Sequence, residues 1–271
     1  MRFVERVERA LGRQPARLLA LCLEVGEHAH ILACVARATI VTVGNELVSG
    51  DVENTNGSWL ARTLAGLGVE VGLIAALRDD VDEVAAFVRE QAASADVVIV
   101  TGGLGGTPDD LTREAIAAAF GVPQVEQPEV ADRLRARFAR DPEYVARWAR
   151  LPEGSRALEN PLGGAPGFAI GNVYVLPGLP AEMEAMFDTL ADELRSGGPI
   201  ASWRRIYRTT ESRIVAVLEA FGERHPAVFV GSYPSFPETG SEVEIVVKSS
   251  DPKALAAAAA WLEAALDDAI R

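Results

Sequence analysis

Apolar residues in this chain follow two alternating patterns from Ala38 onward. Unbroken apolar runs rich in β-branched residues, typical of strands buried on both faces, occur at 38–44 and 96–102. Between such runs, apolar residues recur at helical spacing, and glycines mark the ends. The predicted order is strand 38–44, helix 54–68, strand 69–77, helix 82–93, strand 96–102 and helix 109–120. Alternation of this kind predicts βαβ units and a mostly parallel sheet.

The pattern changes after residue 120. Residues 126–150 are charged and helix-prone with few strong apolar anchors, which indicates an insertion or cover segment. The next segment predicts a hairpin over 167–178 that turns at Gly171-Asn172, followed by an amphipathic helix over 180–194. The last part predicts strand 205–209, helix 211–222, strands 227–233 and 241–250, and helix 252–270. This βαββα order predicts a small α+β domain, ferredoxin-like in outline.

The chain therefore divides into three predicted parts: an N-terminal extension over 1–37, a main α/β domain over 38–195 and a small domain over 196–271. In the extension, arginines recur every three to four positions and would line one face of a helix. They are Arg2, Arg6, Arg9, Arg13 and Arg17. The extension is interpreted as an arm that docks on a partner subunit, as an accessory helix, or as upstream sequence from a misplaced start. The last two interpretations are favoured over the first.

Composition limits which partners the chain can bind and which metal it could use. The formal net charge of −13 argues against nucleic acid as a main partner, because duplex binding needs a basic surface. Residues 17–36 are apolar but are interrupted by Glu24, Glu27 and two histidines, so no membrane span is predicted and a cytoplasmic protein is expected. Two cysteines and three histidines are too few for a zinc site in the body of the protein. A catalytic metal would need oxygen ligands, which favours Mg²⁺ or Mn²⁺.

The stretch TGGLGGTPDD, residues 101–110, joins a predicted strand to a predicted helix. Thr107, Pro108 and Asp110 suit a helix start, with Thr107 as the cap and Pro108 in the first turn. Capping does not explain Gly102, Gly103, Gly105 and Gly106, because such glycines are useful mainly where a ligand or another backbone approaches closely. Taken alone, the stretch fits a capped helix and a ligand-binding loop about equally well.

Two further strand-to-helix junctions carry polar residues. VGNELVSGDVENTN (43–56) holds Glu46, Asp51 and a run of Asn54, Thr55 and Asn56, of which helix capping explains at most two. LPGLPAEMEAMF (176–187) repeats a tight Pro-Gly turn before a helix. Because open parallel sheets bind ligands at the carboxyl ends of their strands, these junctions are expected to converge on one pocket. Asp79, after the second strand, is a fourth candidate, although a solvated turn aspartate explains it equally well.

These three motifs resemble the molybdopterin-binding-type domain of the CinA family, and more distantly the MogA and MoaB proteins and the N-terminal half of eukaryotic FAD synthases. The resemblance covers about residues 38–195, and AVFVGSYPS and EVEIVVKSS resemble the small domain that follows in CinA-like proteins. It implies a three-layer α/β sandwich, with a phosphorylated ligand in the pocket. Gly106 stands where these proteins commonly have proline, and Asn45 where they have threonine or aspartate.

The resemblance implies metal-dependent hydrolysis of a pyrophosphate bond in ADP-ribose, FAD or a similar dinucleotide. Asp110 and Asp79 match the pair of important aspartates in MogA-like relatives, and Glu46 is the third catalytic candidate. Asp79, Asp109, Asp110 and Asp51 are the candidate ligands of Mg²⁺, Mn²⁺ or Co²⁺. Glu46 or Asp51 could hold the metal or orient water. The candidate ligand-binding residues are Gly44, Asn45, Gly50, Asn54, Asn56, Thr101, Gly102, Gly103, Gly105, Thr107, Pro177, Gly178 and Pro180.

Two alternatives stay open. The chain could bind molybdopterin, or transfer adenylyl groups, in molybdenum cofactor metabolism. It could also be a non-catalytic nucleotide-binding module whose carboxylates cap helices. In each case the expected partner is a small nucleotide or pterin, with no nucleic acid and no membrane. Relatives form dimers or trimers, so a homo-oligomer is expected.

Overall fold

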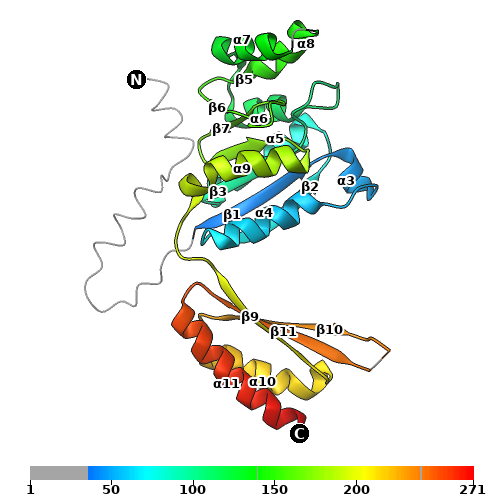
Figure 1. Cartoon of the computed structure of the whole chain (residues 1–271), viewed down its shortest axis with the longest axis vertical. Coiled ribbons are helices and arrows are strands. Elements are labelled where there is room, and N and C mark those ends of the chain that lie inside the picture. Colours follow the sequence, from blue (N-terminus) through cyan, green and yellow to red (C-terminus); the bar gives the residue numbers. More distant parts are fainter. Residues whose placement is uncertain (1–35, 139, 239) are drawn as a thin grey trace, which may run out of the picture. The chain divides into compact units, whose positions relative to one another are not determined.

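The computed structural model describes residues 36–138, 140–238 and 240–271 (Figure 1). The expectations about the N-terminal extension, including its arginine face, lie almost wholly outside these residues. Within them the chain forms two compact units. The larger unit comprises residues 36–64 and 69–195, and the smaller comprises 65–68 and 196–271.

A six-stranded sheet with the order β2-β1-β3-β8-β7-β6 forms the centre of the larger unit. Four neighbouring strands are parallel: β2 (Glu70–Leu77), β1 (Arg37–Val43), β3 (Val97–Thr101) and β8 (Val173–Leu176). The antiparallel strands β7 (Gly167–Ile170) and β6 (Arg156–Leu158) extend the sheet at the β8 side. The hairpin between β7 and β8 turns at Gly171, with Ile170 paired to Val173, as the sequence predicted.

Helices cover both faces of this sheet. On one face, α5 (Val81–Ser94) and α6 (Thr112–Phe120) share a core with alternate strand residues such as Val41, Val100 and Val175. On the other face lie α4 (Thr55–Gly66) and α9 (Pro180–Leu194), joined by an edge-to-face contact between Trp59 and Phe187. The predicted three-layer sandwich with a mostly parallel sheet is therefore confirmed.

The segment after α6 forms a small cover of its own. It contains α7 (Pro128–Arg137), α8 (Pro142–Ala146) and the short 3₁₀ helix η1 (Arg147–Ala149). A two-stranded ladder of β4 (Gln124–Glu126) and β5 (Arg150–Pro152) closes its base. Its buried apolar residues form one cluster, against which Phe138 and Trp148 pack: Val130, Ala131, Leu134, Val145 and Ala149.

The smaller unit has the predicted βαββα order. Its elements are β9 (Ala201–Tyr207), α10 (Glu211–Arg224), β10 (Phe229–Ser235), β11 (Glu242–Ser249) and α11 (Pro252–Ile270). The three strands form an antiparallel sheet with β11 in the middle. The first strand begins at Ala201 rather than at residue 205, because β9 has a polar, exposed face that hides its start in the hydropathy pattern. No helix within the described residues is long and apolar enough to cross a membrane.

Candidate functional site

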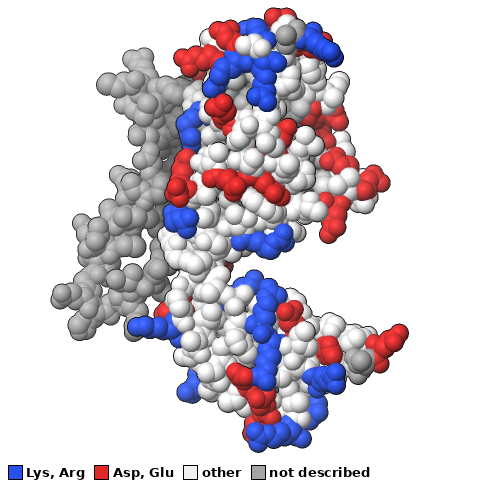
Figure 2. All heavy atoms as spheres, viewed as in Figure 1, with Lys and Arg blue, Asp and Glu red and all other residues white. Residues whose placement is uncertain are grey.

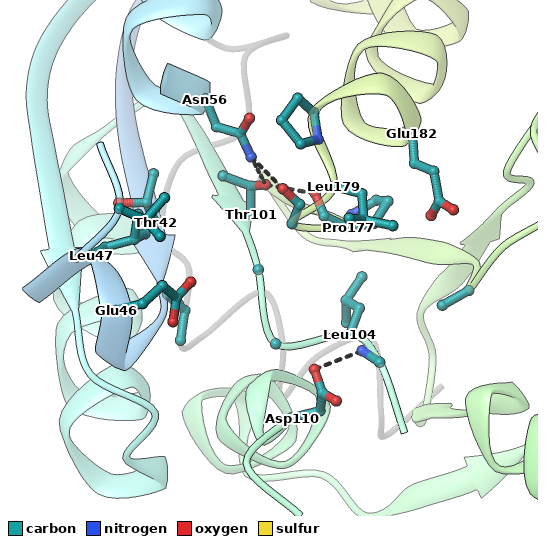
Figure 3. Close-up of a pocket in the computed structure, with 18 of the residues that line it drawn as sticks. Thr42, Glu46, Leu47, Asn56, Thr101, Leu104, Asp110, Pro177, Leu179 and Glu182 are labelled. Carbon is teal, nitrogen blue, oxygen red and sulfur yellow. Dashed lines mark hydrogen bonds between the residues drawn. The ribbon is translucent and has the colours of Figure 1, made fainter. Parts of the chain in front are cut away.

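One cavity of about 450 Å³ lies at the carboxyl ends of β1, β3 and β8 (Figure 3). All three predicted strand-to-helix junctions line it. The predicted residues on its wall are Glu46, Asn54, Asn56, Thr101, Gly102, Gly103, Gly105, Asp110, Pro177, Gly178 and Pro180. Their placement follows from the parallel pairing of β1, β3 and β8, which brings the ends of these strands to the same edge.

The glycines after β3 allow the three strand ends to pack closely. Gly102 has φ +107°, and a Cβ there would lie 2.1 Å from the Val43 carbonyl oxygen. Gly178 also packs against Gly102, because a Cβ at Gly178 would lie 3.2 Å from the Gly102 Cα. Gly103 has φ +64° and faces the Thr112 hydroxyl. Only glycine fits such positions, and the backbone itself therefore forms part of the cavity wall.

Asp110 organises this loop and does not begin a helix. Its two carboxylate oxygens accept hydrogen bonds from the backbone N–H groups of Gly105 and Thr107, each at 2.8 Å, and Oδ2 also accepts from the Thr107 hydroxyl. The predicted helix start at residue 109, with Pro108 in its first turn, is wrong, because α6 begins at Thr112. Asp110 accepts from the Thr107 N–H, as the predicted capping box requires, but it also accepts from the Gly105 N–H and lies before the helix rather than in its first turn.

The Arg113 side chain also fixes this loop through hydrogen bonds to its backbone. Arg113 is only 6% exposed, and its guanidinium donates to the carbonyl oxygens of Leu104 and Gly105, both at 2.7 Å. Burial lowers the pKa of Arg113, and the nearby carboxylates of Glu114 and Asp110 oppose that shift. The backbone N–H groups of Gly103 and Leu104 donate no hydrogen bond within the described part of the chain. Gly103 and Leu104 both line the cavity.

The junction after β1 supplies Glu46 and two asparagines. Glu46 lies in the short helix α3 (Asn45–Ser49), and Figure 3 shows its carboxylate turned toward the cavity. Asn54 caps α4 by accepting from the Gly57 N–H at 2.9 Å, and it donates to the Thr42 hydroxyl. Asn56 donates to the Gly178 carbonyl oxygen at 2.8 Å. Capping therefore explains Asn54, whereas Asn56 ties two walls of the cavity together.

Seven predicted residues do not line the cavity: Gly44, Asn45, Gly50, Asp51, Asp79, Thr107 and Asp109. The Asp79 carboxylate accepts from the Asn45 N–H at 2.8 Å and so braces the start of α3. Desolvation raises the pKa of Asp79, and the charges of Glu46, Asp109 and Asp110 add to this, while the Asn45 hydrogen bond opposes it. A hydrogen bond from Thr107 lowers the pKa of Asp109. Asp51 accepts from the Ser49 hydroxyl.

Several lining residues were not among the candidates. They are Thr42, Val43, Leu47, Val52, Glu53, Thr55, Leu104, Trp148, Gly164, Ala165, Leu179 and Glu182. Trp148 comes from the cover segment, where nothing in the local pattern connects it with the sheet edge. Glu182 stands two positions after Pro180 in a motif already identified as part of the pocket. Its place in the first turn of α9 was the signal that could have identified it.

The cavity wall is acidic. Glu46, Glu53, Asp110 and Glu182 line it, and no lysine, arginine or histidine does. Acidic side chains also gather on the side of the larger unit where Figure 1 places α3 (Figure 2). Among residues 36–138, 140–238 and 240–271, no three or more histidine, cysteine, aspartate or glutamate side chains could by themselves hold a metal ion.

The donor set nevertheless fits a hard divalent cation that arrives with a phosphorylated ligand. Mg²⁺ is commonly bound through one or two carboxylates together with phosphate oxygens. Glu46 and Asp110 supply two carboxylates on the cavity wall beside the glycine loop. All the charged donors are oxygens, which Mg²⁺ and Mn²⁺ prefer.

Two buried polar atoms on lining residues have no hydrogen-bond partner. They are Asn56 Oδ1 and Trp148 Nε1. Buried polar groups are nearly always paired, so an unpaired group calls for an explanation such as a ligand or water. The Asn56 Nδ2 group already donates to the Thr101 hydroxyl and to the Gly178 carbonyl oxygen, so only the amide oxygen is left without a partner.

Comparison with known proteins agrees with the motifs. Residues 39–196 match the family described as "Probable molybdopterin binding domain", and residues 204–271 match "FAD synthase, middle domain". A protein from Archaeoglobus fulgidus is 40% identical over 195 residues, which cover 72% of this chain and 84% of that protein. A CinA-like protein from Frankia casuarinae is 43% identical over 203 residues, covering 69% of this chain and 47% of that protein.

Among solved structures, the protein CinA from Thermoplasma acidophilum is 32% identical to this chain, with a TM-score of 0.55. The match covers 58% of this chain and 98% of that structure. The resemblance to the CinA family that the motifs indicated is thus confirmed. Because the first family match spans more than half of the sequence, this chain belongs to the probable molybdopterin binding domain family.

Proposed function

We propose that this protein hydrolyses the pyrophosphate bond of a nucleotide such as ADP-ribose or FAD. The observation that carries the proposal is the juxtaposition of free backbone donors with carboxylates on one cavity wall. The N–H groups of Gly103 and Leu104 suit phosphate oxygens, and Glu46 and Asp110 lie on the same wall. No basic side chain lines the cavity, so a bound pyrophosphate needs a cation to offset the carboxylates.

A divalent cation held by Asp110 together with the ligand's phosphates would neutralise charge on the pyrophosphate. The chain's own groups supply binding and proton transfer. Backbone donors of the glycine loop orient the phosphates, and the Glu46 carboxylate accepts a proton from the attacking water. The oxygen of that water bonds to one phosphorus, and the bond from this phosphorus to the bridging oxygen breaks. From ADP-ribose the products are AMP and ribose 5-phosphate.

The test is AMP release by the purified full chain from ADP-ribose and from FAD, with Mg²⁺, Mn²⁺ or Co²⁺. We expect metal-dependent turnover that Glu46→Gln lowers by roughly 100-fold, the usual scale for losing a general base. Glu90→Gln, an exposed acid on α5, is the matched control and should leave turnover unchanged. Absence of AMP release from both substrates with all three metals would contradict the proposal.

A second candidate function follows from the family description, which names molybdopterin. In that case the same cavity binds a pterin, or its adenylylated form, and transfers or carries it without hydrolysing free dinucleotides. Pterin fluorescence that co-purifies with the full chain, together with no turnover of ADP-ribose or FAD, would favour this alternative.

A further inference from the structure

We infer that the Glu182 carboxylate accepts a hydrogen bond from an amino group on the base of the bound nucleotide, and that this end of the cavity binds adenine. This inference rests on the proposed nucleotide substrate and adds to it the part of the ligand that is recognised. Figure 3 places Glu182 on the opposite side of the pocket from Glu46, so the two acids serve different parts of a ligand.

Glu182 is held as an acceptor by a buried amide. Asn160 is only 6% exposed, and its Nδ2 donates to Glu182 Oε2 at 2.8 Å and to the Ala165 carbonyl oxygen at 3.1 Å. The Asn160 Oδ1 accepts from the Leu162 N–H at 3.0 Å, which fixes the orientation of the amide. One carboxylate oxygen is therefore fixed to the loop 160–165, and no hydrogen bond within the described residues engages the other, Oε1.

The position of Oε1 depends on a glycine. A Cβ at Gly164 would lie 2.4 Å from this oxygen, so the carboxylate packs directly onto the Gly164 backbone. Gly164, Ala165 and Glu182 all line the cavity. The loop and the first turn of α9 thus hold one acceptor at the cavity wall.

The residues around Glu182 determine which chemical group of a ligand can contact its carboxylate. A carboxylate accepts hydrogen bonds and repels phosphate, so its ligand partner is an N–H or O–H donor. The lining side chains nearest to Glu182 along the chain, Leu179 and Pro180, and Ala165 of the loop that holds it are apolar, and Leu104 and Trp148 also line the cavity. The Trp148 ring is fixed by edge-to-face contacts with Phe138 and Tyr144, at centroid distances of 5.7 and 6.1 Å. Apolar and aromatic walls with one acceptor suit a flat base that carries an amino group better than a sugar, whose hydroxyls need several polar partners.

The experiment compares equilibrium binding of AMP and IMP to the full chain, since IMP replaces the adenine amino group by a carbonyl oxygen. Wild-type protein should bind AMP at least about tenfold more tightly, because a carbonyl facing a carboxylate leaves both acceptors unpaired. In Glu182→Gln the new amide can donate to the IMP carbonyl, so the preference should disappear or reverse. Asp188→Asn, an exposed acid on the same helix, is the matched control and should keep the AMP preference.

Two further measurements keep the outcomes separate. Gly164→Ala should weaken the AMP preference without removing the carboxylate, because the added methyl group displaces it. Equal binding of AMP and IMP by wild-type protein would overturn the adenine site and leave hydrolysis unaffected. If wild-type protein binds 2′-deoxy-AMP more weakly than AMP but binds AMP and IMP equally, the ribose and not the adenine amino group is recognised. That result would likewise overturn the adenine site. Absence of binding by either nucleotide, with and without Mg²⁺, would overturn this inference together with the nucleotide substrate.

Discussion

The glycine loop shows most directly how single residues shape the cavity. Gly102 combines φ +107° with a Cβ position 2.1 Å from a backbone oxygen of Val43. A backbone oxygen in a central strand has little freedom to move, unlike the end of a flexible side chain. Any side chain at 102 must therefore change the backbone conformation of the loop or separate the ends of β1 and β3.

We accordingly expect Gly102→Ala to lower the free energy of unfolding by at least about 2 kcal/mol, from the backbone strain and the overpacking together. Urea unfolding of the full chain measures this effect. Gly66→Ala is the control, because Gly66 ends α4 and has nothing within 4 Å of an added Cβ. It should change stability by less than about 1 kcal/mol, in the stabilising direction. Equal effects of the two substitutions would contradict the close packing described for Gly102.

The aspartates show what residue patterns could and could not predict. The motif identified Asp110 as a candidate for the cavity wall, which it lines, but the local rules placed it in the first turn of a helix capped by Thr107. In the structure the carboxylate folds back on Gly105 and Thr107. Turn geometry of this kind depends on the whole loop, including Arg113, whose side chain enters from the next helix. Asp79 was a candidate for the cavity and instead accepts a hydrogen bond from the Asn45 N–H, because a sequence pattern predicts the end of a strand but not the direction of the side chains that follow it.

Interactions between elements include one link whose strength depends on pH. The Tyr174 hydroxyl of β8 donates to Glu193 of α9 at 2.8 Å, and Arg156 of β6 pairs with the same carboxylate. Burial, and then the Glu193 hydrogen bond and charge, raise the pKa of Tyr174 to about 12, while Arg156 opposes the shift. The folded protein therefore keeps the phenol proton at a pH where the unfolded chain, with a pKa of 10.0, loses it.

This link should stabilise the fold fully below pH 10 and lose its effect as the pH rises toward 12. Tyr174→Phe should be less stable than wild type by roughly 1 kcal/mol at pH 8, the scale of one lost hydrogen bond. The difference should shrink between about pH 10 and 12, because only the wild type has this phenol to ionise. Denaturant unfolding of both proteins across this range is the measurement. A constant difference from pH 8 to 12 would contradict the assignment.

For helices and strands, predictions from the sequence were correct where the hydrophobic pattern was long and regular. The strands β1 and β3 and the helices α4, α5 and α9 were all predicted, because buried strands and amphipathic helices leave clear hydrophobic patterns. The three-residue strands β4, β5 and β6 were not, since so short a segment has no measurable period and exists only through its pairing. The same limit hid Trp148, which reaches the cavity through the tertiary placement of the cover segment.

At the scale of the whole molecule, every residue that lines the cavity lies between Thr42 and Glu182. The core beneath the cavity also belongs entirely to the larger unit. Backbone hydrogen bonds from Ser196 to Leu67 and from Ile200 to Ala65 support the end of α4, so a fragment should include them. A chain of this length can bury a sufficient core without a second domain.

We therefore expect a fragment of residues 36–200 to fold and to bind AMP with a Kd within about threefold of that of the full chain, because the fragment holds the complete wall of the cavity. Calorimetric titration gives the affinity, and circular dichroism before and after heating establishes cooperative folding. Glu46→Gln and Glu182→Gln placed in the fragment should change AMP binding by the same factors as in the full chain. A folded fragment that binds AMP more than tenfold more weakly would show that residues after 200 contribute to the ligand site. A fragment that fails to fold would show that the larger unit depends on the smaller one for its stability.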